Sequence, residues 1–338
     1  MDGPQVALLG YGEVGRVLAA GLAPHTRLRV YDPAYPPNGT PAGSPDESVA
    51  RSPGGSAVRL PGGSAGCVLA GCNAEAVRGA DVVIAVTTGA DSLAACAQTR
   101  PYVKPGALYA DLSTSAPGDK RQIAELLEPA GAAVVDGAIM APIPLRGLAT
   151  PVLASGAHAD RFAAFAGEHG MSVTSIGGSP GDAAARKLLR SVLVKGLSAL
   201  AIESRRAAEA AGLGEWFWEH LVETVTAADE EFVVRLLRGA GQHSVRRVHE
   251  MEAATRMLEA LGVPATMTEA TTRTLNQITH TGIPITPDTA TIPSTSDTAT
   301  IPSTSGAAIS STSGAAAIPT VPGSAAVPAA PEADGGGA

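Results

Sequence analysis

The stretch Val6-Ala-Leu-Leu-Gly10-Tyr-Gly12-Glu-Val-Gly15 decides the fold of the first half of this 338-residue chain. The apolar residues before the first glycine predict a short buried strand, and the residues after the last one predict a helix. Gly10 permits a tight turn, Gly12 lets a ligand approach the backbone, and Gly15 allows close packing of helix on strand. In this strand–turn–helix context, Gly-x-Gly-x-x-Gly is typical of a dinucleotide-binding site.

The start of the predicted helix supplies the second part of that site. Free backbone N–H groups at Glu13 and Val14, with the positive end of the helix dipole, suit a pyrophosphate. Asp32 follows the next predicted strand, residues 28–31, and lies 32 − 10 = 22 residues after Gly10. A carboxylate at this distance accepts hydrogen bonds from the ribose hydroxyls of NAD.

The choice between the two nicotinamide dinucleotides depends on the surroundings of Asp32. Its charge would repel the 2′-phosphate of NADP, so the sequence favours NAD(H). Arg51 or Arg59, in the following segment, can fold back toward such a phosphate and would favour NADP(H). The same residues also fit a tight turn and a solvated acid with no nucleotide bound.

The first half of the chain alternates short apolar runs with helical segments, which predicts a parallel sheet covered by helices on both faces. The expected strands are residues 6–10, 28–31, 82–86, 107–111 and 133–136, and the expected helices include 14–22 and 120–127. Ligands of such sheets bind at the carboxyl ends of the strands. Thr87, Thr88 and Ser113 follow two of these strands, so their hydroxyls are candidates for contacts with ribose and nicotinamide, or ordinary helix caps.

Composition divides the chain into three parts. Residues 1–178 form the expected Rossmann-type α/β domain, in which the Pro-, Gly- and Ser-rich residues 33–66 predict a flexible loop. Residues 179–282 predict an all-α domain for substrate and dimerisation. Residues 283–338 are low-complexity Ser, Thr, Ala and Pro, which predicts a disordered tail.

The all-α part begins with a long segment almost free of helix breakers. The expected helices are residues 183–211, 215–238, 243–261 and 265–280. Leu189, Leu193 and Leu200 recur at helical spacing and predict a stripe that packs on the helical domain. Trp216 and Trp218 are expected to pack there or at a dimer interface.

Charge and composition exclude several classes of partner. The net charge of −8 offers no basic surface for nucleic acid or an anionic membrane. The three cysteines have no CxxC spacing and the histidines no ligand spacing, so we expect free thiols and no metal. The N-terminus does not resemble a signal peptide, and no uncharged run is long enough to span a bilayer, which predicts a cytoplasmic protein.

The order of these motifs resembles the β-hydroxyacid dehydrogenase and 6-phosphogluconate dehydrogenase superfamily. The resemblance covers residues 4–280 and includes 111–117 (Asp-Leu-Ser-Thr-Ser-Ala-Pro) and a lysine-bearing helix between the domains. The helical half is similar to a branch with an uncharacterised phosphogluconate-dehydrogenase-like C-terminal domain. Residues 187–197 and 246–252 contain that likeness, and the family's helical domain implies a homodimer.

The resemblance implies that Lys187 is the general acid/base, since the family's lysine follows a glycine-containing turn such as 181–187. Two departures weaken the match. Ser191 stands where the family has Asn, and the substrate loop Asp-Ala-Pro-Val-Ser-Gly-Gly is replaced by 136–142, which includes Met140 and ends in Ala-Pro. Asp-Gly-Ala-Ile-Met in this loop is similar to imine reductases.

Lys187, Ser191 and Lys195 are spaced by four residues and therefore lie along one helix face. Burial and the neighbouring Lys195 would lower the pKa of Lys187 toward working pH. The chain is thus expected to be an NAD(P)-dependent dehydrogenase or reductase of a small hydroxyacid-like substrate, with Lys187 moving the proton and Lys195 holding a carboxylate. The alternatives are an imine or ketimine reductase, and a non-catalytic dinucleotide-binding accessory or regulator.

Overall fold

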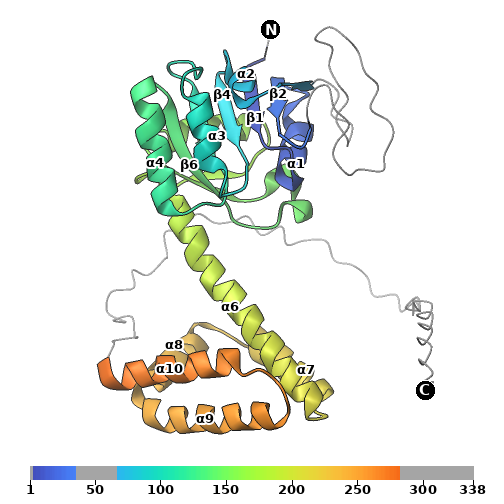
Figure 1. Ribbon diagram of the computed structural model, residues 1–338, viewed down its shortest axis with the longest axis vertical. Coiled ribbons are helices and arrows are strands. Elements are labelled where there is room, and N and C mark those ends of the chain that lie inside the picture. Colours follow the sequence, from blue (N-terminus) through green and yellow to red (C-terminus); the bar gives the residue numbers. More distant parts are fainter. Residues whose placement is uncertain (1–2, 36–66, 282–338) are drawn as a thin grey trace, which may run out of the picture. The chain divides into compact units, whose positions relative to one another are not determined.

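The structure is a computed structural model that describes residues 3–35 and 67–281 (Figure 1). Most of the predicted loop 33–66 and the whole predicted tail 283–338 lie outside the described residues. None of the described helices is both long and apolar enough to cross a membrane. The described part consists of an α/β region followed by helices, as the sequence predicts.

One sheet organises the α/β region, and its strands have the order β3-β2-β1-β4-β5-β6-β7-β8. The strands are β1 (Gln5–Leu9), β2 (Arg27–Tyr31), β3 (Cys67–Leu69), β4 (Val82–Ala85), β5 (Leu108–Asp111), β6 (Ala133–Ile139), β7 (Val152–Ser155) and β8 (Val173–Ser175). The five predicted strands are all present. The sequence analysis missed β3, β7 and β8, which are short and bounded by loops.

The sheet is parallel except at one pair. The five predicted strands pair in parallel, as the sequence predicts. β6 and β7 run antiparallel, with Asp136 opposite Ser155. The connection between them contains only the short 3₁₀ turns η2 (Ile143–Leu145) and η3 (Gly147–Ala149). A parallel neighbour requires a longer crossover, usually a helix, which this segment does not form.

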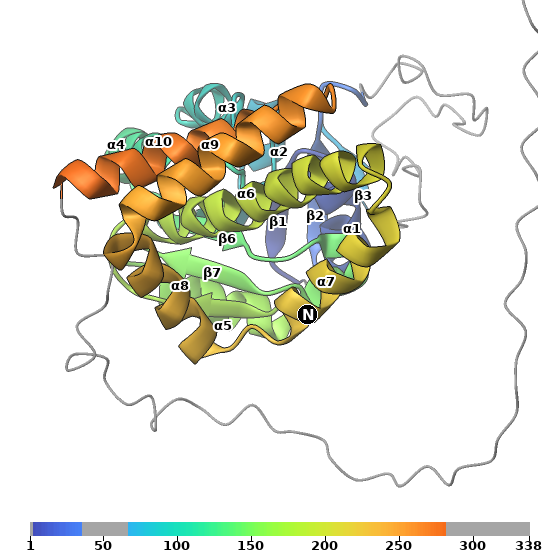
Figure 2. The ribbon, with the colours of Figure 1, turned by 90° about the horizontal axis from the view of Figure 1, so that it is seen from below.

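Helices cover both faces of the sheet, as Figures 1 and 2 show. They are α1 (Glu13–Leu22), α2 (Asn73–Val77), α3 (Ser92–Thr99), α4 (Pro117–Leu127) and α5 (Ala159–Glu168). Because side chains alternate along a strand, Val6 and Leu8 join the core under α1 and α5, whereas Ala7 and Leu9 join the core under α2, α3 and α4.

The helical region begins at α6 (Asp182–Ala210) and continues with α7 (Gly214–Thr226), α8 (Glu230–Gln242), α9 (Ser244–Ala260) and α10 (Thr266–Thr281). The single helix predicted over 215–238 is wrong, because the chain breaks after Thr226. Asp229 accepts a hydrogen bond from Phe232 N at 2.7 Å and so caps a new helix. Glu203 of α6 accepts bonds from the backbone N–H groups of Met267 and Thr268, which fixes the start of α10.

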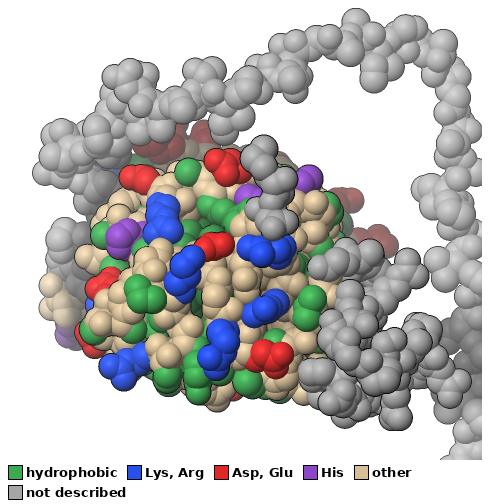
Figure 3. Space-filling view, turned by 90° about the horizontal axis from the view of Figure 1, so that it is seen from above, with side chains coloured by type: hydrophobic (Ala, Val, Ile, Leu, Met, Phe, Trp, Pro, Cys, Tyr) green, Lys and Arg blue, Asp and Glu red, His purple; other side chains and the backbone are tan. Residues whose placement is uncertain are grey.

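No element of residues 3–35 and 67–281 covers the apolar stripe of α6. Leu189 and Leu193 are 71% and 70% exposed, so the prediction that they pack on the helical domain is wrong. The other helices contact α6 around Glu203 and Ala207, more than a turn beyond these leucines. On the face seen in Figure 3, by contrast, hydrophobic side chains are scattered among charged and polar ones.

The turn between β1 and α1 has the geometry that its glycines predict. Gly10 has a φ of +105°, and a Cβ there would lie 2.7 Å from the Val86 carbonyl oxygen. A Cβ on Gly15 would overlap the Gly10 carbonyl, so this glycine sets how closely α1 packs on the turn. A Cβ on Gly12 would meet no atom within 4 Å, because Gly12 faces open space.

Gly15→Ala is expected to lower the free energy of unfolding by about 1–3 kcal/mol, because α1 must move away from the turn. Gly12→Ala is the matched control and should leave stability nearly unchanged. Urea denaturation followed by circular dichroism measures both. Equal stability of the two variants would contradict the close packing at Gly15.

Candidate functional site

Asp32 at the end of β2 is held against the glycine turn. One carboxylate oxygen accepts a hydrogen bond from Tyr11 N at 2.6 Å, and the other accepts one from Ala34 N at 2.8 Å. These bonds fix the carboxylate beside the turn where the sequence analysis expected the ribose. Arg51 and Arg59, the candidate partners of a 2′-phosphate, lie outside the described residues.

A cation that the sequence analysis did not consider lies close to Asp32. Arg16, in the first turn of α1, donates from Nε to the Tyr11 carbonyl at 3.3 Å and from Nη2 to the Tyr35 hydroxyl at 3.0 Å. Its position three residues after Glu13, on the helix that follows the glycine turn, is the signal that would have indicated it.

A cavity of about 370 Å³ opens where the carboxyl ends of β4 and β5 meet α1 and α6. It is lined by Glu13, Val14, Val86, Thr87, Leu112, Ser113, Thr114, Ile139, Met140, Ala141, Pro142, Ile143, Lys187, Arg190, Ser191 and Lys195. The structure thus brings the predicted catalytic set, Lys187, Ser191 and Lys195, together with four of the predicted cofactor-binding residues. Gly10, Gly12, Gly15, Asp32 and Thr88 are not among the lining residues.

The three predicted hydroxyls at the strand ends have different hydrogen-bond partners. Thr87 and Ser113 share a hydrogen bond of 3.0 Å, which ties the loop after β4 to the loop after β5 inside the cavity. Thr88 instead donates to the Asp91 carboxylate at 2.5 Å and accepts from Asp91 N. Thr88 therefore stabilises the turn before α3, and its contact with a cofactor stays a prediction.

Lys187 is the chemically distinctive group of the cavity. Its Nζ donates to the Thr114 hydroxyl at 2.6 Å. Burial, and then the positive charges of Lys120 and Lys195, lower the pKa of Lys187 to about 8, while Asp136 opposes the shift. An amine with such a pKa exchanges a proton readily near neutral pH, which suits a general acid or base.

The cavity combines a cationic wall with an apolar one. Lys187, Arg190 and Lys195 face it from α6, and Glu13 is the acidic residue among its lining. The sequence analysis missed Arg190, although its spacing of three from Lys187 places it on the same side of the helix. Residues 139–143, at the end of β6 and in the turn after it, supply apolar side chains.

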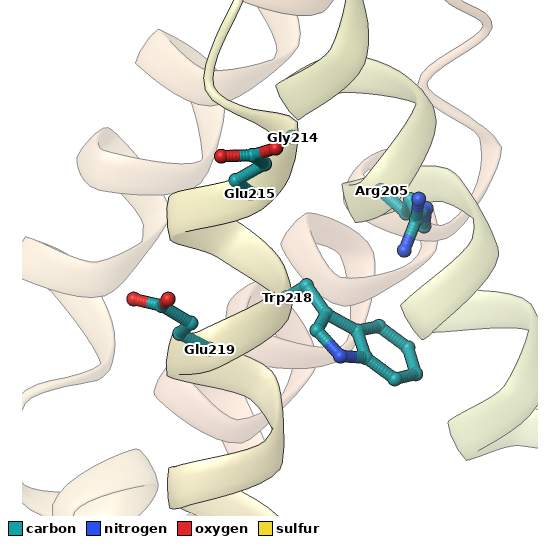
Figure 4. Close-up of a pocket in the computed structure, with 5 residues that line it drawn as sticks. All are labelled: Arg205, Gly214, Glu215, Trp218 and Glu219. Carbon is teal, nitrogen blue, oxygen red and sulfur yellow. The ribbon is translucent and has the colours of Figure 1, made fainter. Parts of the chain in front are cut away.

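A second hollow of about 370 Å³ lies beside α6 and α7, lined by Arg205, Gly214, Glu215, Trp218 and Glu219 (Figure 4). The Arg205 guanidinium lies 5.3 Å from the Trp218 ring centroid and donates to Glu209. Figure 4 shows the two glutamates on the side of α7 away from Trp218. Because its polar groups do not converge, this hollow is a weaker candidate for a catalytic site.

Metal binding has no support among residues 3–35 and 67–281, where no cluster of His, Cys, Asp or Glu can hold an ion. Cys67, Cys72 and Cys96 are free thiols. Burial raises the pKa of Cys67 to about 11 and that of Cys96 to about 12. These two thiols are therefore poor nucleophiles at neutral pH.

Several solved structures of imine reductases have the same fold as this chain. The imine reductase from Pseudomonas sp. superposes with a TM-score of 0.62 at 19% identity, over 83% of this chain and 95% of that one. The chain has the imine reductase fold. An imine reductase from Aspergillus terreus, in complex with NADPH4 and dibenz[c,e]azepine, has a TM-score of 0.61 at 17% identity, over 82% and 94% of the two chains. One from Myxococcus stipitatus, in complex with NADP+, has a TM-score of 0.61 at 16% identity, over the same shares.

Sequence comparison gives a second match. Residues 208–278 match a family model described as a domain of unknown function, DUF1932. No curated protein sequence matches the chain. The fold class predicted from the sequence is confirmed, and the match over residues 208–278 agrees with the predicted likeness of the helical half to an uncharacterised domain.

Proposed function

We propose that this protein is a nicotinamide-dinucleotide-dependent oxidoreductase that interconverts a CH–OH group and a carbonyl on a small anionic substrate. The observation that supports it most is Lys187, a lysine of lowered pKa held by Thr114 in a cavity at the carboxyl ends of β4 and β5. A proton-transfer group placed where α/β sheets bind their ligands is the minimum that such an enzyme requires.

The cofactor is proposed from the glycine turn and the start of α1. Gly12 leaves open space beside the backbone, and α1 begins directly after it. The free N–H groups of this helix end suit a pyrophosphate. Two of the solved structures that share the fold are described in complex with NADPH4 or NADP+.

For the nucleotide type we propose NAD(H), because the fixed Asp32 carboxylate favours ribose hydroxyls over a 2′-phosphate. The NADP-bound structures of the same fold favour the alternative. Arg16 is the described cation best placed to pair with a 2′-phosphate, since it contacts Tyr11 and Tyr35 beside Asp32.

In the proposed reaction, a nicotinamide dinucleotide bound at the glycine turn would supply the acceptor for the hydride that leaves the carbon bearing the hydroxyl. Neutral Lys187 takes the hydroxyl proton onto Nζ, so that the C–O bond becomes a carbonyl. In the reverse direction the Lys187 ammonium returns the proton to the carbonyl oxygen. The Thr114 hydroxyl, 2.6 Å from Nζ, holds the amine in place during both steps.

The walls of the cavity indicate the substrate. Lys195 and Arg190 suit a carboxylate or a similar anionic group, and residues 139–143 suit an apolar part. The same apolar wall and the shared fold favour a second candidate, reduction of an imine or ketimine. Binding of nucleotide without turnover of hydroxyacids, ketoacids or imines would support the third candidate, a non-catalytic accessory protein.

Lys187→Ala is expected to lower turnover by about 10²-fold or more at pH 8, because the proton loses its acceptor, while nucleotide affinity stays unchanged. Steady-state absorbance of NADH with a panel of hydroxyacids and ketoacids measures the first, and fluorescence titration the second. Lys104→Ala, which removes an exposed lysine, is the control. Turnover near the wild-type value would exclude Lys187 from the reaction.

We also propose that a second copy of the chain covers the apolar stripe of α6. Leu189, Val192 and Leu193 are each at least 70% exposed and follow the spacing of a helix seam. Gly196 continues this face and would allow a second helix to approach closely. An apolar patch of this kind marks an interface, and a two-fold axis lets identical patches cover each other.

Light scattering of the purified chain is expected to give twice the 33.7 kDa mass of one chain. Leu193→Glu should shift the protein to the monomer, because it places a charge in the apolar seam. Leu145→Glu, at a residue that is 79% exposed outside the helical region, is the matched control and should stay dimeric. A monomeric wild-type protein would refute the proposal.

A further inference from the structure

A buried lysine that the proposed reaction does not use lies behind the cavity. Lys120, on α4, is 1% exposed. Its Nζ donates to the Asp111 carbonyl at 2.7 Å and lies 3.0 Å from Asp111 Oδ2 and 3.4 Å from Asp136 Oδ1. Lysine is almost never buried so fully unless it is paired, so these contacts define a specific site for the charge.

Lys120 compensates one carboxylate oxygen of Asp111 and one of Asp136. Asp111 Oδ2 and Asp136 Oδ1 are buried and have no hydrogen-bond partner in the part of the chain that the structure describes. Each lies within ion-pair distance of the Lys120 amine. Buried polar groups without compensation are costly, so the pairing with Lys120 compensates both side chains and fixes their orientation.

One arm of this cluster fixes the helix that bears Lys187. Asp136 Oδ2 accepts hydrogen bonds from Gly181 N at 2.9 Å and Ala184 N at 3.0 Å. Gly181 has no side chain to cap α6, so Asp136 supplies the cap from β6. Lys187 is less than one helical turn beyond Ala184 and therefore takes its position from this cap.

The other arm fixes the loop that holds the Lys187 amine. Asp111 Oδ1 accepts a hydrogen bond from Ser113 N at 3.0 Å. The next residue is Thr114, whose hydroxyl accepts from Lys187 Nζ at 2.6 Å. Lys120 thus lies at the junction of the two segments whose relative placement sets the Lys187 amine.

We propose that Lys120 is a positioning residue for Lys187, acting through Asp136 on the start of α6, through Asp111 on the loop after β5, and through its own positive charge. This role rests on the proposed function of Lys187 as the proton-transfer group. Asp111, Lys120 and Asp136 are called the buried triad below.

The charge of Lys120 acts in a defined direction. After burial, Lys120 is the largest cause that lowers the pKa of Lys187, ahead of Lys195, and Asp136 acts in the opposite sense. The charged groups around the Lys187 amine are Lys120 from α4, Asp136 from β6, Glu13 from α1, and Arg190 and Lys195 from α6. Without Lys120, the repulsion of the protonated amine falls and the attraction of Asp136 remains, so the pKa of Lys187 rises.

The consequence for kcat differs in size between the two directions of the reaction. A raised pKa leaves less neutral Lys187 at pH 8, which slows its action as a base. It leaves more protonated Lys187 at the same pH, so its action as an acid loses less. A residue that only stabilised the fold would lower both directions equally and would not move the pH profile.

The test measures the titration of Lys187 without substrate or nucleotide. The chain has four lysines, at 104, 120, 187 and 195, so acetylation of each by acetic anhydride can be followed separately by peptide mass spectrometry across pH. In the wild type, the midpoint for Lys187 is expected near pH 8. In Lys120→Met it is expected to rise by about one pH unit.

Two further variants keep the result decisive. If Lys120→Met alone does not fold, it can be combined with Asp111→Asn. The double variant removes one positive and one negative charge and so preserves the net charge of the buried triad. Its Lys187 midpoint should also rise. Lys104→Met removes an exposed ion pair with Asp81 and should leave the midpoint at the wild-type value.

An unshifted Lys187 midpoint in folded Lys120 variants would overturn the proposal, even if the enzyme turns over its substrate. A shifted midpoint in a protein with no detectable turnover would support the positioning role and count against the proposed function instead. Where turnover is found, the pH profile of kcat/KM should move by the same amount as the labelling midpoint.

Discussion

The hydrogen bonds from the start of α6 to the Asp136 carboxylate are the interaction on which the site depends. Gly181 N and Ala184 N donate to one oxygen of a side chain that belongs to β6. Because the cap comes from the sheet, the first turn of α6 has a fixed position relative to the strand ends. The cavity, the placement of Lys187 in it and the contact with Thr114 all follow from this attachment.

Electrostatics then gives the site its chemistry. The chain has more acidic than basic residues overall, yet three of its cations face one cavity from a single helix. A local excess of positive charge attracts an anionic substrate and also makes an amine easier to deprotonate. Substrate binding and proton transfer therefore share one physical cause in the proposed account.

The sequence predicted the parts of this structure that short-range patterns specify. The glycine turn, Asp32, five strands and the start of α6 could be found because strand and helix periodicities and turn residues are local. It missed β7 and β8, which are only four and three residues long and so show little of the strand periodicity. It also joined α7 and α8, where a single capping side chain, Asp229, separates them. It also assigned the α6 leucines to a core within the chain, since periodicity shows that a face is apolar but not what covers it.

In the site, too, local patterns predict some residues, whereas others depend on contacts between elements. Lys187 and Ser191 were predicted from the resemblance and Lys195 from its spacing on the same helix face, and the structure places the three around one cavity. The roles of Lys120 and Thr114 were missed because they depend on contacts with other elements of the fold. Lys120 contacts Asp136 on β6, and Thr114 contacts Lys187, which lies 73 positions further along the chain. No pattern in the sequence distinguishes a buried lysine from the exposed lysines of an ordinary helix.

The most direct test of the account is a paired fluorescence titration of the purified protein with NADH and NADPH, with Asp32→Ala alongside. The account predicts that NADH binds more tightly than NADPH and that the substitution weakens NADH binding, since the ribose hydroxyls lose their acceptor. Tighter binding of NADPH would reverse the assignment of nucleotide and direct attention to Arg16. Absence of binding of either nucleotide would contradict the proposed function.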